Sequence, residues 1–329
     1  MDMAQIRLEH IGKRFTVYER PPGRFGALKG LVKRQKRIVR ALEDVSFSIE
    51  EGELVGYIGP NGAGKSTTAK VMSGILTPEE GSCTILGRTP WKQRVAHVSQ
   101  IGVVFGQRSQ LWWDVPVSDS FELLRDIYGV AEGNYRRRLS ELADILELSA
   151  LLKTPVRQLS LGQRMRCEVA AALLHQPRIL FLDEPTIGLD AVSKLALREF
   201  LQRENREHGV TMILTTHDMD DVESLCSRIM TIGRGRLLFD GSLQALKDRY
   251  APIHRVRATL EREAPAAAVE GAEEVRMEGT ACTVFFDPRR IPAHRIVARL
   301  AEALPLRDIV VEEEDIDAII AAMYREMAL

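Results

Sequence analysis

Nine consecutive residues have the types and spacing needed to hold a chain of phosphates. They read Gly59-Pro60-Asn61-Gly62-Ala63-Gly64-Lys65-Ser66-Thr67, and the first eight match the pattern G-x-x-x-x-G-K-[ST]. Glycines let the backbone wrap so that amide N–H groups converge on phosphate oxygens, and a helix that starts here adds its positive partial charge. Lys65 supplies a mobile cation for the outer phosphates, and the Ser66 hydroxyl is placed to bind Mg²⁺. The segment therefore predicts nucleotide binding, but not the use of the nucleotide.

Two adjacent carboxylates, Asp183 and Glu184, follow the apolar run Ile179 to Leu182. A buried strand that ends in this pair delivers Asp183 to a Mg²⁺ site and leaves Glu184 to polarise an attacking water as general base. Taken alone, the segment could also be a strand followed by a solvated acidic turn. Beside the phosphate-binding loop, hydrolysis of the nucleotide is the favoured interpretation.

The elements that must position these groups alternate between short apolar runs and longer amphipathic stretches. Leu54 to Ile58, Ile179 to Leu182 and Val210 to Thr215 have the pattern of strands, and Thr67 to Ile75 has helical spacing. This alternation predicts an α/β fold with a mostly parallel central sheet. Val117 to Leu152 has almost wholly helical spacing, which indicates a helical insertion between core strands.

The chain is long enough for one large domain and one small domain, with 329 residues of which 45% are hydrophobic and 28% charged. After a hairpin turn at Gly233 to Arg236, the order strand, hairpin, helix, strand, helix begins near His254. We therefore expect a nucleotide-binding domain at 1–246, with a helical subdomain at about 108–165, and a small α+β domain at 251–329.

Further motifs between and after these sites carry a family resemblance. Leu159-Ser160-Leu161-Gly162-Gln163-Arg164 resembles the signature sequence of ATP-binding-cassette (ABC) proteins. Gln107, the segment Gly188-Leu189-Asp190 and His217 match, in the family's order, its Q-loop glutamine, D-loop and switch histidine. The resemblance extends from about Ile6 to Leu246 and implies a P-loop core with an antiparallel β subdomain and a helical insertion.

The resemblance also implies that ATP and Mg²⁺ are bound between two copies. In the family, the signature Ser and Gly of the opposing subunit close the open face of the γ-phosphate at a helix N-terminus. Ser160 and Gly162, with Gln163 beside them, are therefore expected to act on the partner's ATP, and Asp190 to belong to the same nucleotide-binding set. ATP binding would close the two domains, and hydrolysis would release them.

Catalytic roles follow from the same resemblance. His217 is expected to contact the γ-phosphate and to hold in line the water that Glu184 activates. Gln107 is expected to sense Mg²⁺ and this water at the junction with the helical insertion. Taken by itself, a histidine after a strand is more often an ordinary hydrogen-bonding residue. The motifs around His217 favour the catalytic role.

Two positions fit the family pattern loosely. Leu161 replaces the usual first glycine of the signature, which should alter local packing but keeps Ser160 and Gly162. The family stacks an aromatic ring on the adenine base, and Phe15 is the first choice for this ring, with Tyr18 as the alternative. An aromatic residue at position 15 also fits ordinary core packing.

Residues 20–40 form a basic insertion, with eight Lys or Arg and no Asp or Glu, that is longer than the usual first hairpin of the family. It could contact anionic lipid headgroups or an acidic loop of a membrane subunit, or it could be a solvated loop. Trp112 and Trp113 lie where the family receives the coupling helix of its transmembrane subunit, although either ring could instead pack in the core.

The partners and the location are expected from charge, hydropathy and resemblance. The net charge of −1 gives no general attraction to nucleic acid, and neither a spanning run nor a signal peptide is evident. The resemblance implies a second copy or close homologue, separate transmembrane permease subunits, and a peripheral position on the cytoplasmic side of the inner membrane.

The direction of transport is also inferred from resemblance. The acidic segment Val311 to Ile320 resembles the tail of cassettes that serve exporters of the ABC-2 type, which favours a bacterial efflux system. The alternative is a non-transport ABC ATPase that acts mechanically on a ribosome or nucleic acid. For the small C-terminal domain, a structural or dimer-stabilising role is the default, and a regulatory ligand site is the alternative.

Overall fold

The computed structural model describes residues 4–19, 35–106, 109–251, 253–265, 268–312, 314 and 316–326, without the side chains of residues 18, 19 and 35. The chain divides into two compact units, Met1–Asp240 and Gly241–Leu329. The division precedes α9 (Leu243–Tyr250), which packs against α11 (Ile316–Glu326) of the second unit. Part of α9 lies before position 246, so the second unit begins earlier in the chain than the small domain we expected.

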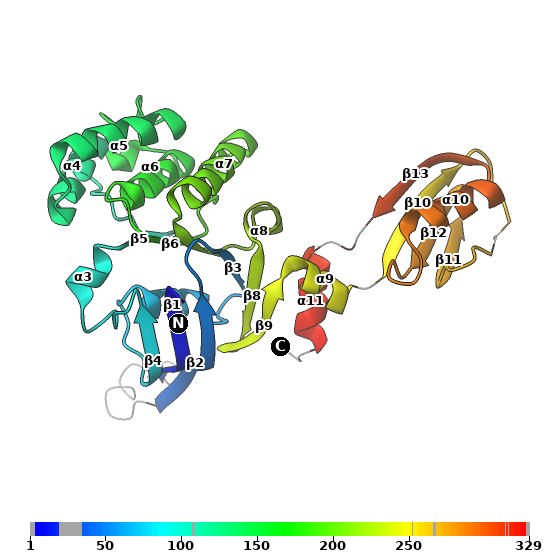
Figure 1. The fold of residues 1–329 in the computed structure, drawn as a ribbon, viewed down its shortest axis with the longest axis horizontal. Helices are drawn as coiled ribbons and strands as arrows, with labels where there is room; N and C mark the ends of the chain where they lie inside the picture. Colours follow the sequence, from blue (N-terminus) through cyan, green and yellow to red (C-terminus); the bar gives the residue numbers. More distant parts are fainter. Residues whose placement is uncertain are drawn as a thin grey trace, which may run out of the picture. The chain divides into compact units, whose positions relative to one another are not determined.

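A six-stranded sheet forms the centre of the first unit (Figure 1). Its order is β5 (Ile101–Phe105), β6 (Ile179–Asp183), β7 (Thr211–Thr215), β3 (Leu54–Ile58), β8 (Arg228–Gly233) and β9 (Arg236–Ser242). The pairs β5–β6, β6–β7, β7–β3 and β3–β8 are parallel. Every residue of β3 and β7 is buried, as expected for continuous apolar runs in a parallel sheet covered on both faces. The predicted strands and parallel sheet are confirmed.

A second, antiparallel sheet of order β2-β1-β4 belongs to the same unit. Its strands are β1 (Ile6–Glu19), β2 (Gln35–Ile49) and β4 (Glu80–Ile85). Buried side chains from this sheet, such as Ile6 and Ile49, join side chains of the parallel sheet, such as Tyr57 and Phe181, in one apolar cluster. The shared core fixes the antiparallel sheet beside β3, which leads into the phosphate-binding loop.

Helices flank the parallel sheet and form the predicted insertion. The insertion contains α4 (Val117–Tyr128), α5 (Glu132–Ile145), a short 3₁₀ helix (Val156–Gln158) and α6 (Leu161–Leu173). In Figure 1, α4, α5 and α6 lie together. The remaining helices of this unit are α2 (Lys65–Met72), α3 (Arg94–Val98), α7 (Ala191–His208) and α8 (Met219–Leu225). Since α6 runs from the signature to residue 173, the helical part continues beyond 165.

The second unit contains a four-stranded antiparallel sheet of order β11-β12-β10-β13. Its elements are β10 (His254–Leu260), β11 (Glu274–Glu278), β12 (Ala281–Phe286), α10 (Ala293–Ala303) and β13 (Leu306–Glu312). Buried residues of α10, including Ile296 and Leu300, pack with Val256 and Phe286 of the sheet. With α11 at the end, the predicted order of strand, hairpin, helix, strand, helix is confirmed.

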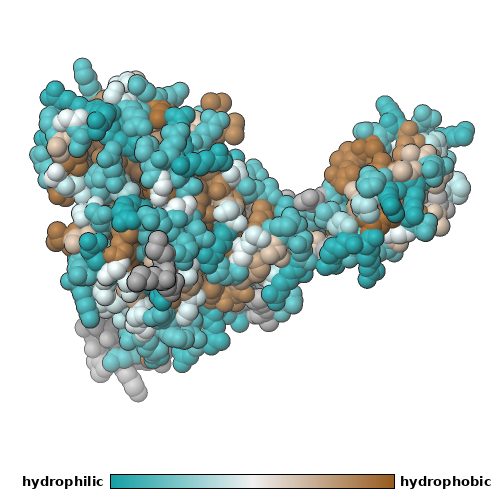
Figure 2. All heavy atoms as spheres, in the orientation of Figure 1, coloured by the Kyte–Doolittle hydropathy of each residue, from teal (hydrophilic) through white to brown (hydrophobic). Residues whose placement is uncertain are grey.

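The surface in view in Figure 2 is mostly hydrophilic, and its apolar atoms gather in separate patches. Within the parts of the chain that the structure describes, none of the helices combines the length and the apolar character needed to cross a bilayer.

His175 connects the helical insertion to the parallel sheet. Its ring stacks on Tyr128 at 3.9 Å between centroids, and its Nε2 lies 2.9 Å from the carbonyl oxygen of Ile101. Burial lowers the pKa of His175 to about 4. The unfolded chain therefore binds a proton at this residue below about pH 6.5, whereas the folded protein does not until about pH 4.

We therefore expect acid to destabilise the fold through this residue. Between about pH 6.5 and 4 the free energy of unfolding should fall by up to about 1.4 kcal/mol for each pH unit because of His175. Urea unfolding at pH 7 and pH 5 measures this effect. The variant His175→Gln should lose about 2 kcal/mol less than the parent between these two pH values. Equal losses in the two proteins would contradict the burial of a neutral imidazole.

Candidate active site

The phosphate-binding loop lies between the end of β3 and the start of α2. Gly64 is the N-cap of α2, its φ is 118°, and as a glycine it has no side chain with which to cap the helix. A Cβ atom at this position would lie 2.8 Å from the carbonyl oxygen of Ala41, so the close approach of the two backbones also requires glycine. The uncapped first turn leaves its N–H groups for a ligand, which is the arrangement that binds phosphate at helix N-termini.

Lys65 lies in the first turn of α2. Its ammonium donates hydrogen bonds to the carbonyl oxygens of Gly59 at 2.5 Å and Pro60 at 3.2 Å. Burial lowers the pKa of Lys65, and the negative charges of Asp183 and Glu184 oppose this shift. The Lys65 ammonium is thus bound to carbonyl groups of its own loop, and it is attracted by the negative charges of the two carboxylates.

A cavity of about 500 Å³ brings the loop and the carboxylates together. Its described lining includes Pro60 to Thr67, Asp183 and Glu184. This volume falls within the usual range of small-molecule sites, about 300–1,000 Å³. Several further lining residues were not predicted as site residues, among them Val39, Arg40 and Ala41 on β2. Their position depends on the pairing of β2 with β1, for which the sequence pattern gives no signal.

Asp183 and Glu184 come at the end of β6, next to β7. The parallel pairing places Asp183 beside Thr215, whose hydroxyl donates a hydrogen bond to Asp183 Oδ1. Glu184 has a φ of 54°, in the left-handed region that glutamate rarely adopts. His217 Nδ1 lies 2.9 Å from Glu184 Oε1. The structure therefore joins the predicted base and the predicted switch histidine in one contact, at a strained backbone position of the kind found at functional sites.

The signature residues are elsewhere in the same unit. Neither Ser160 nor Gly162 is among the described residues that line the cavity. Ser160 caps α6: its Oγ accepts a hydrogen bond from Gln163 N at 3.2 Å, and Gln163 Oε1 accepts one from Ser160 N at 2.9 Å. This reciprocal capping box gives α6 a defined N-terminus with an exposed serine.

The signature turn also contacts the D-loop of the same copy. A Cβ atom on Gly188 would lie 2.6 Å from Leu161 Cδ2, so the leucine that replaces glycine packs directly on Gly188. Asp190 caps α7 by accepting a hydrogen bond from Ser193 N at 2.8 Å, and hydrogen bonds from Ser193 lower the pKa of Asp190. The altered packing expected from Leu161 is therefore a contact with the D-loop.

Phe15 is the predicted adenine platform. It pairs with Val39 across the antiparallel sheet and is 36% exposed. Residues directly opposite in an antiparallel pair have their side chains on one face, and Val39 lines the cavity. Lys13 Nζ lies 5.5 Å from the centroid of the Phe15 ring. The Tyr18 side chain, Gln107 and residues 20–34 of the basic insertion lie outside the described residues.

Trp112 and Trp113 are 40% and 51% exposed, so neither ring is wholly in the core. The guanidinium carbon of Arg164 lies 5.7 Å from the centroid of the Trp113 ring. The segment before them is attached to α6, because the buried Glu168 carboxylate accepts hydrogen bonds from Ser109 Oγ and from Gln110 N. This surface is therefore connected to the helix that begins at the signature.

The loop between a parallel strand and a helix, with two carboxylates in its cavity, defines a P-loop nucleotide hydrolase. Residues 42–187 match the family model described as ABC transporter. The chain belongs to the ABC transporter family, as one of its ATP-binding subunits.

Known relatives match about two thirds of the chain. The chain is 34% identical over 212 residues to the ABC transporter ATP-binding protein NatA of Bacillus subtilis, matching 64% of this chain and 86% of NatA. It is 34% identical over 215 residues to the linearmycin resistance ATP-binding protein LnrL of Bacillus subtilis, matching 65% and 68%. It is 33% identical over 217 residues to the methionine import ATP-binding protein MetN of Latilactobacillus sakei, matching 65% and 63%.

A solved structure also resembles the chain. It is a dimeric post-hydrolysis state of the ATP-binding cassette MJ0796 bound to ADP and phosphate, with 27% identity and a TM-score of 0.61 over 72% of this chain and 98% of that one. The family and this likeness make the chain an ATP-binding, ATP-hydrolysing cassette.

Proposed function

We propose that this chain is the motor subunit of an ABC exporter, which drives separate transmembrane subunits through ATP-dependent pairing of two cassettes. One observation carries the proposal. The cavity contains the phosphate-binding loop, Asp183 and Glu184, whereas Ser160 and Gly162 are not part of its described lining. The signature turn has its own exposed helix N-terminus. A second copy that presents this turn would complete the nucleotide site.

Within one copy, Lys65 and the N–H groups at the start of α2 hold the outer phosphates of ATP. Magnesium fits the site, because the Ser66 hydroxyl and the Asp183 carboxylate line the same cavity and supply the oxygen ligands that this ion prefers. Bound there, Mg²⁺ would neutralise charge on the β- and γ-phosphates. We assign Gln107 to the same metal site on family resemblance alone.

For hydrolysis, Glu184 accepts the proton of the attacking water, and His217 orients the water and the γ-phosphate. Their 2.9 Å contact supports these roles, because a general base needs a fixed orientation at the reacting atoms. Phe15 stacks on the adenine base, beside Val39 at the edge of the cavity. Stacking of a base on an aromatic ring contributes about 1–3 kcal/mol.

Across the pair, Ser160, Gly162 and Gln163 of each copy bind the ATP of the other, and Asp190 lies in the same interface. The partner is a second copy of this chain or a close homologue. The dimeric state of the MJ0796 cassette supports this pairing. The exposed serine at the start of α6 supports it too, because a helix N-terminus stabilises the negative charge of a γ-phosphate.

The permease is expected to dock at the exposed Trp112 and Trp113. Export is favoured by the acidic segment Val311 to Ile320, and the resistance role in the name of LnrL is consistent with it, although MetN is named as an import protein. The subunit would then be peripheral on the cytoplasmic side of the membrane. Residues 20–40 are proposed to contact lipid headgroups, and the second unit to stabilise the pair.

Purification from membranes tests this function. A tagged chain is extracted in mild detergent and isolated, and the accompanying proteins are identified by mass spectrometry. We expect one polytopic membrane protein to accompany the parent chain. The double variant Trp112→Ala, Trp113→Ala is compared with the parent chain. The membrane protein should no longer co-purify with this variant, whereas the ATPase rate of the purified variant should equal that of the parent. Salt-sensitive recovery of RNA, without any membrane protein, would contradict the proposal.

A further inference from the structure

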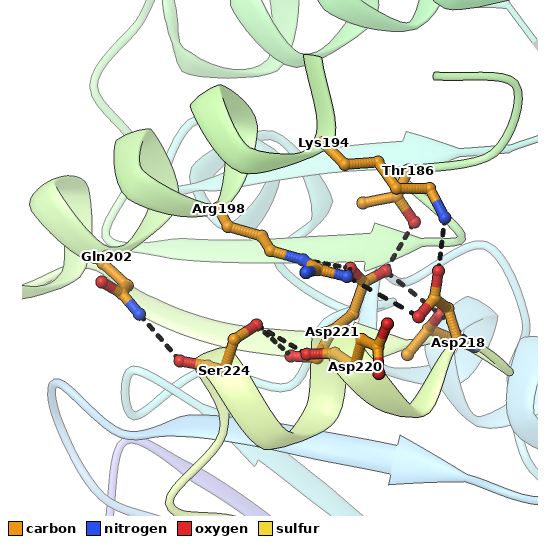
Figure 3. A network of polar contacts seen from close by, with 9 residues as sticks. Thr186, Lys194, Arg198, Gln202, Asp218, Asp220, Asp221 and Ser224 are labelled. Carbon is orange, nitrogen blue, oxygen red and sulfur yellow. Dashed lines mark hydrogen bonds and ion pairs between the residues drawn. The ribbon is translucent and has the colours of Figure 1, made fainter. Parts of the chain in front are cut away.

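A buried carboxylate that we did not single out from the sequence connects three segments around the catalytic pair. Asp221, in the first turn of α8, is 0% exposed. It accepts hydrogen bonds from Thr186 Oγ1 at 2.5 Å and from Arg198 Nε at 2.6 Å (Figure 3). It also accepts one from Thr216 Oγ1 at 3.5 Å. A buried carboxylate is costly unless it is paired and hydrogen-bonded, so loss of any of these partners would destabilise Asp221 in its position.

Each of the three partners belongs to a segment that bears a proposed site residue. Thr186 is two residues after Glu184, and Thr216 directly precedes His217. Arg198 is on α7, which starts after the D-loop residue Asp190. Thr186 and Thr216 are 3% and 4% exposed, so their hydroxyls meet Asp221 in a dry environment. The Asp221 carboxylate thus joins two segments: the turn that follows Glu184 and the end of the strand that precedes His217.

A second contact fixes the other side of the histidine. Asp218 is the residue after His217, and its Oδ2 accepts a hydrogen bond of 2.5 Å from Lys194 Nζ of α7. Its own backbone N–H donates to Thr216 Oγ1 at 3.0 Å. Figure 3 shows Lys194 and Arg198 reaching from α7 toward Asp218 and Asp221. His217 itself is 74% exposed, so core packing does not hold its ring beside Glu184.

We propose that Asp221 is a positioning residue for ATP hydrolysis, which sets the Glu184–His217 contact through Thr186 and Thr216. The inference rests on the roles proposed above for Glu184 and His217. Asp221 does not itself meet the nucleotide, since it is fully buried and is not among the described residues that line the cavity. It acts through the hydroxyl groups of Thr186 and Thr216, which donate hydrogen bonds to it.

The sharpest test removes one hydroxyl without changing the shape of the side chain. Thr186→Val deletes the donor to Asp221, and Thr186→Ser keeps it. We expect Thr186→Val to lower kcat about 10-fold with the Kd for ATP unchanged, because small misplacement of reacting groups lowers rate more than binding. Thr186→Ser should remain near the parent rate. Thr211→Val is the matched control, since Thr211 is also fully buried and its hydroxyl instead accepts from Gly52 N. It should keep the parent kcat.

A double-mutant cycle separates positioning from general loss of stability. If Thr186 acts through the histidine, Thr186→Val should change kcat by less than about 2-fold in a His217→Ala background. Losses that multiply in the double variant, or an unchanged kcat in Thr186→Val alone, would overturn the inference.

A milder variant covers the case in which Thr186→Val does not fold. Lys194 is 32% exposed and pairs with Asp218, whose N–H donates to the Thr216 hydroxyl that also contacts Asp221. Lys194→Met should therefore fold, and should lower kcat about 3-fold only when His217 is present. A loss that persists without His217 would count against the inference. If His217→Ala alone has the parent rate, the proposed role of His217 is wrong. If instead the losses of the two single variants multiply in the double variant, only the inference about Asp221 is wrong.

Discussion

Replacing Glu184 by glutamine is expected to lower kcat by about 10²–10⁴-fold while the affinity for ATP stays close to that of the parent. An amide cannot accept the proton of the attacking water, but its size allows it to keep the position beside His217, 2.9 Å away in the parent. Lys65 and the start of α2 are unchanged, so binding persists. Single-turnover hydrolysis and equilibrium binding of ATP measure the two effects separately.

The same variant should accumulate as an ATP-bound dimer, because closure follows binding and release follows hydrolysis. Sedimentation with and without ATP measures this change. Glu207→Gln, at an exposed glutamate of α7, is the control and should retain the parent rate and the parent sedimentation. Hydrolysis by Glu184→Gln at the parent rate would mean that another group is the base.

Replacing Ser160 by aspartate is expected to abolish ATP-driven pairing without weakening the binding of ATP to a single copy. Aspartate caps a helix as well as serine does, so α6 should keep its N-terminus. Its negative charge would face the partner's γ-phosphate, and such like-charge contact costs several kcal/mol. We expect the dimer to be at least about 100-fold weaker and the ATPase rate to fall with it.

Two controls isolate the charge from the cap. Ser160→Asn places a neutral side chain of the same shape and capping ability, and should pair far better than Ser160→Asp. Ser242→Asp changes another serine N-cap, whose Oγ accepts from Ala245 N at 3.1 Å at the start of α9, and should leave pairing unchanged. If Ser160→Asp pairs as well as Ser160→Asn, the signature turn does not meet phosphate.

Local sequence patterns predicted the elements that position the phosphate site. Leu54 to Ile58 is a continuous apolar run, and such runs belong to strands buried on both faces, so β3 has the predicted bounds. The glycines and lysine of the loop act within one turn of chain, and the adjacent strand and helix follow from periodicity. These features depend on neighbours in sequence, which is why they could be found without coordinates.

Features that depend on distant pairing could not be found this way. The Glu184–His217 contact arises because β6 and β7 are parallel and place Asp183 beside Thr215. Asp221 reads in the sequence as one acid among several at a helix start, and its burial becomes evident only when α7 packs on α8. Val39 enters the cavity through the register of β1 with β2, which its own sequence does not encode.

The most direct measurement is a crystal or cryo-EM structure of Glu184→Gln loaded with ATP and Mg²⁺. We expect two nucleotides, each bound by Lys65 of one copy and covered by Ser160 and Gly162 of the other. A single copy that encloses its ATP with its own residues, in a pocket complete for hydrolysis, would contradict this account.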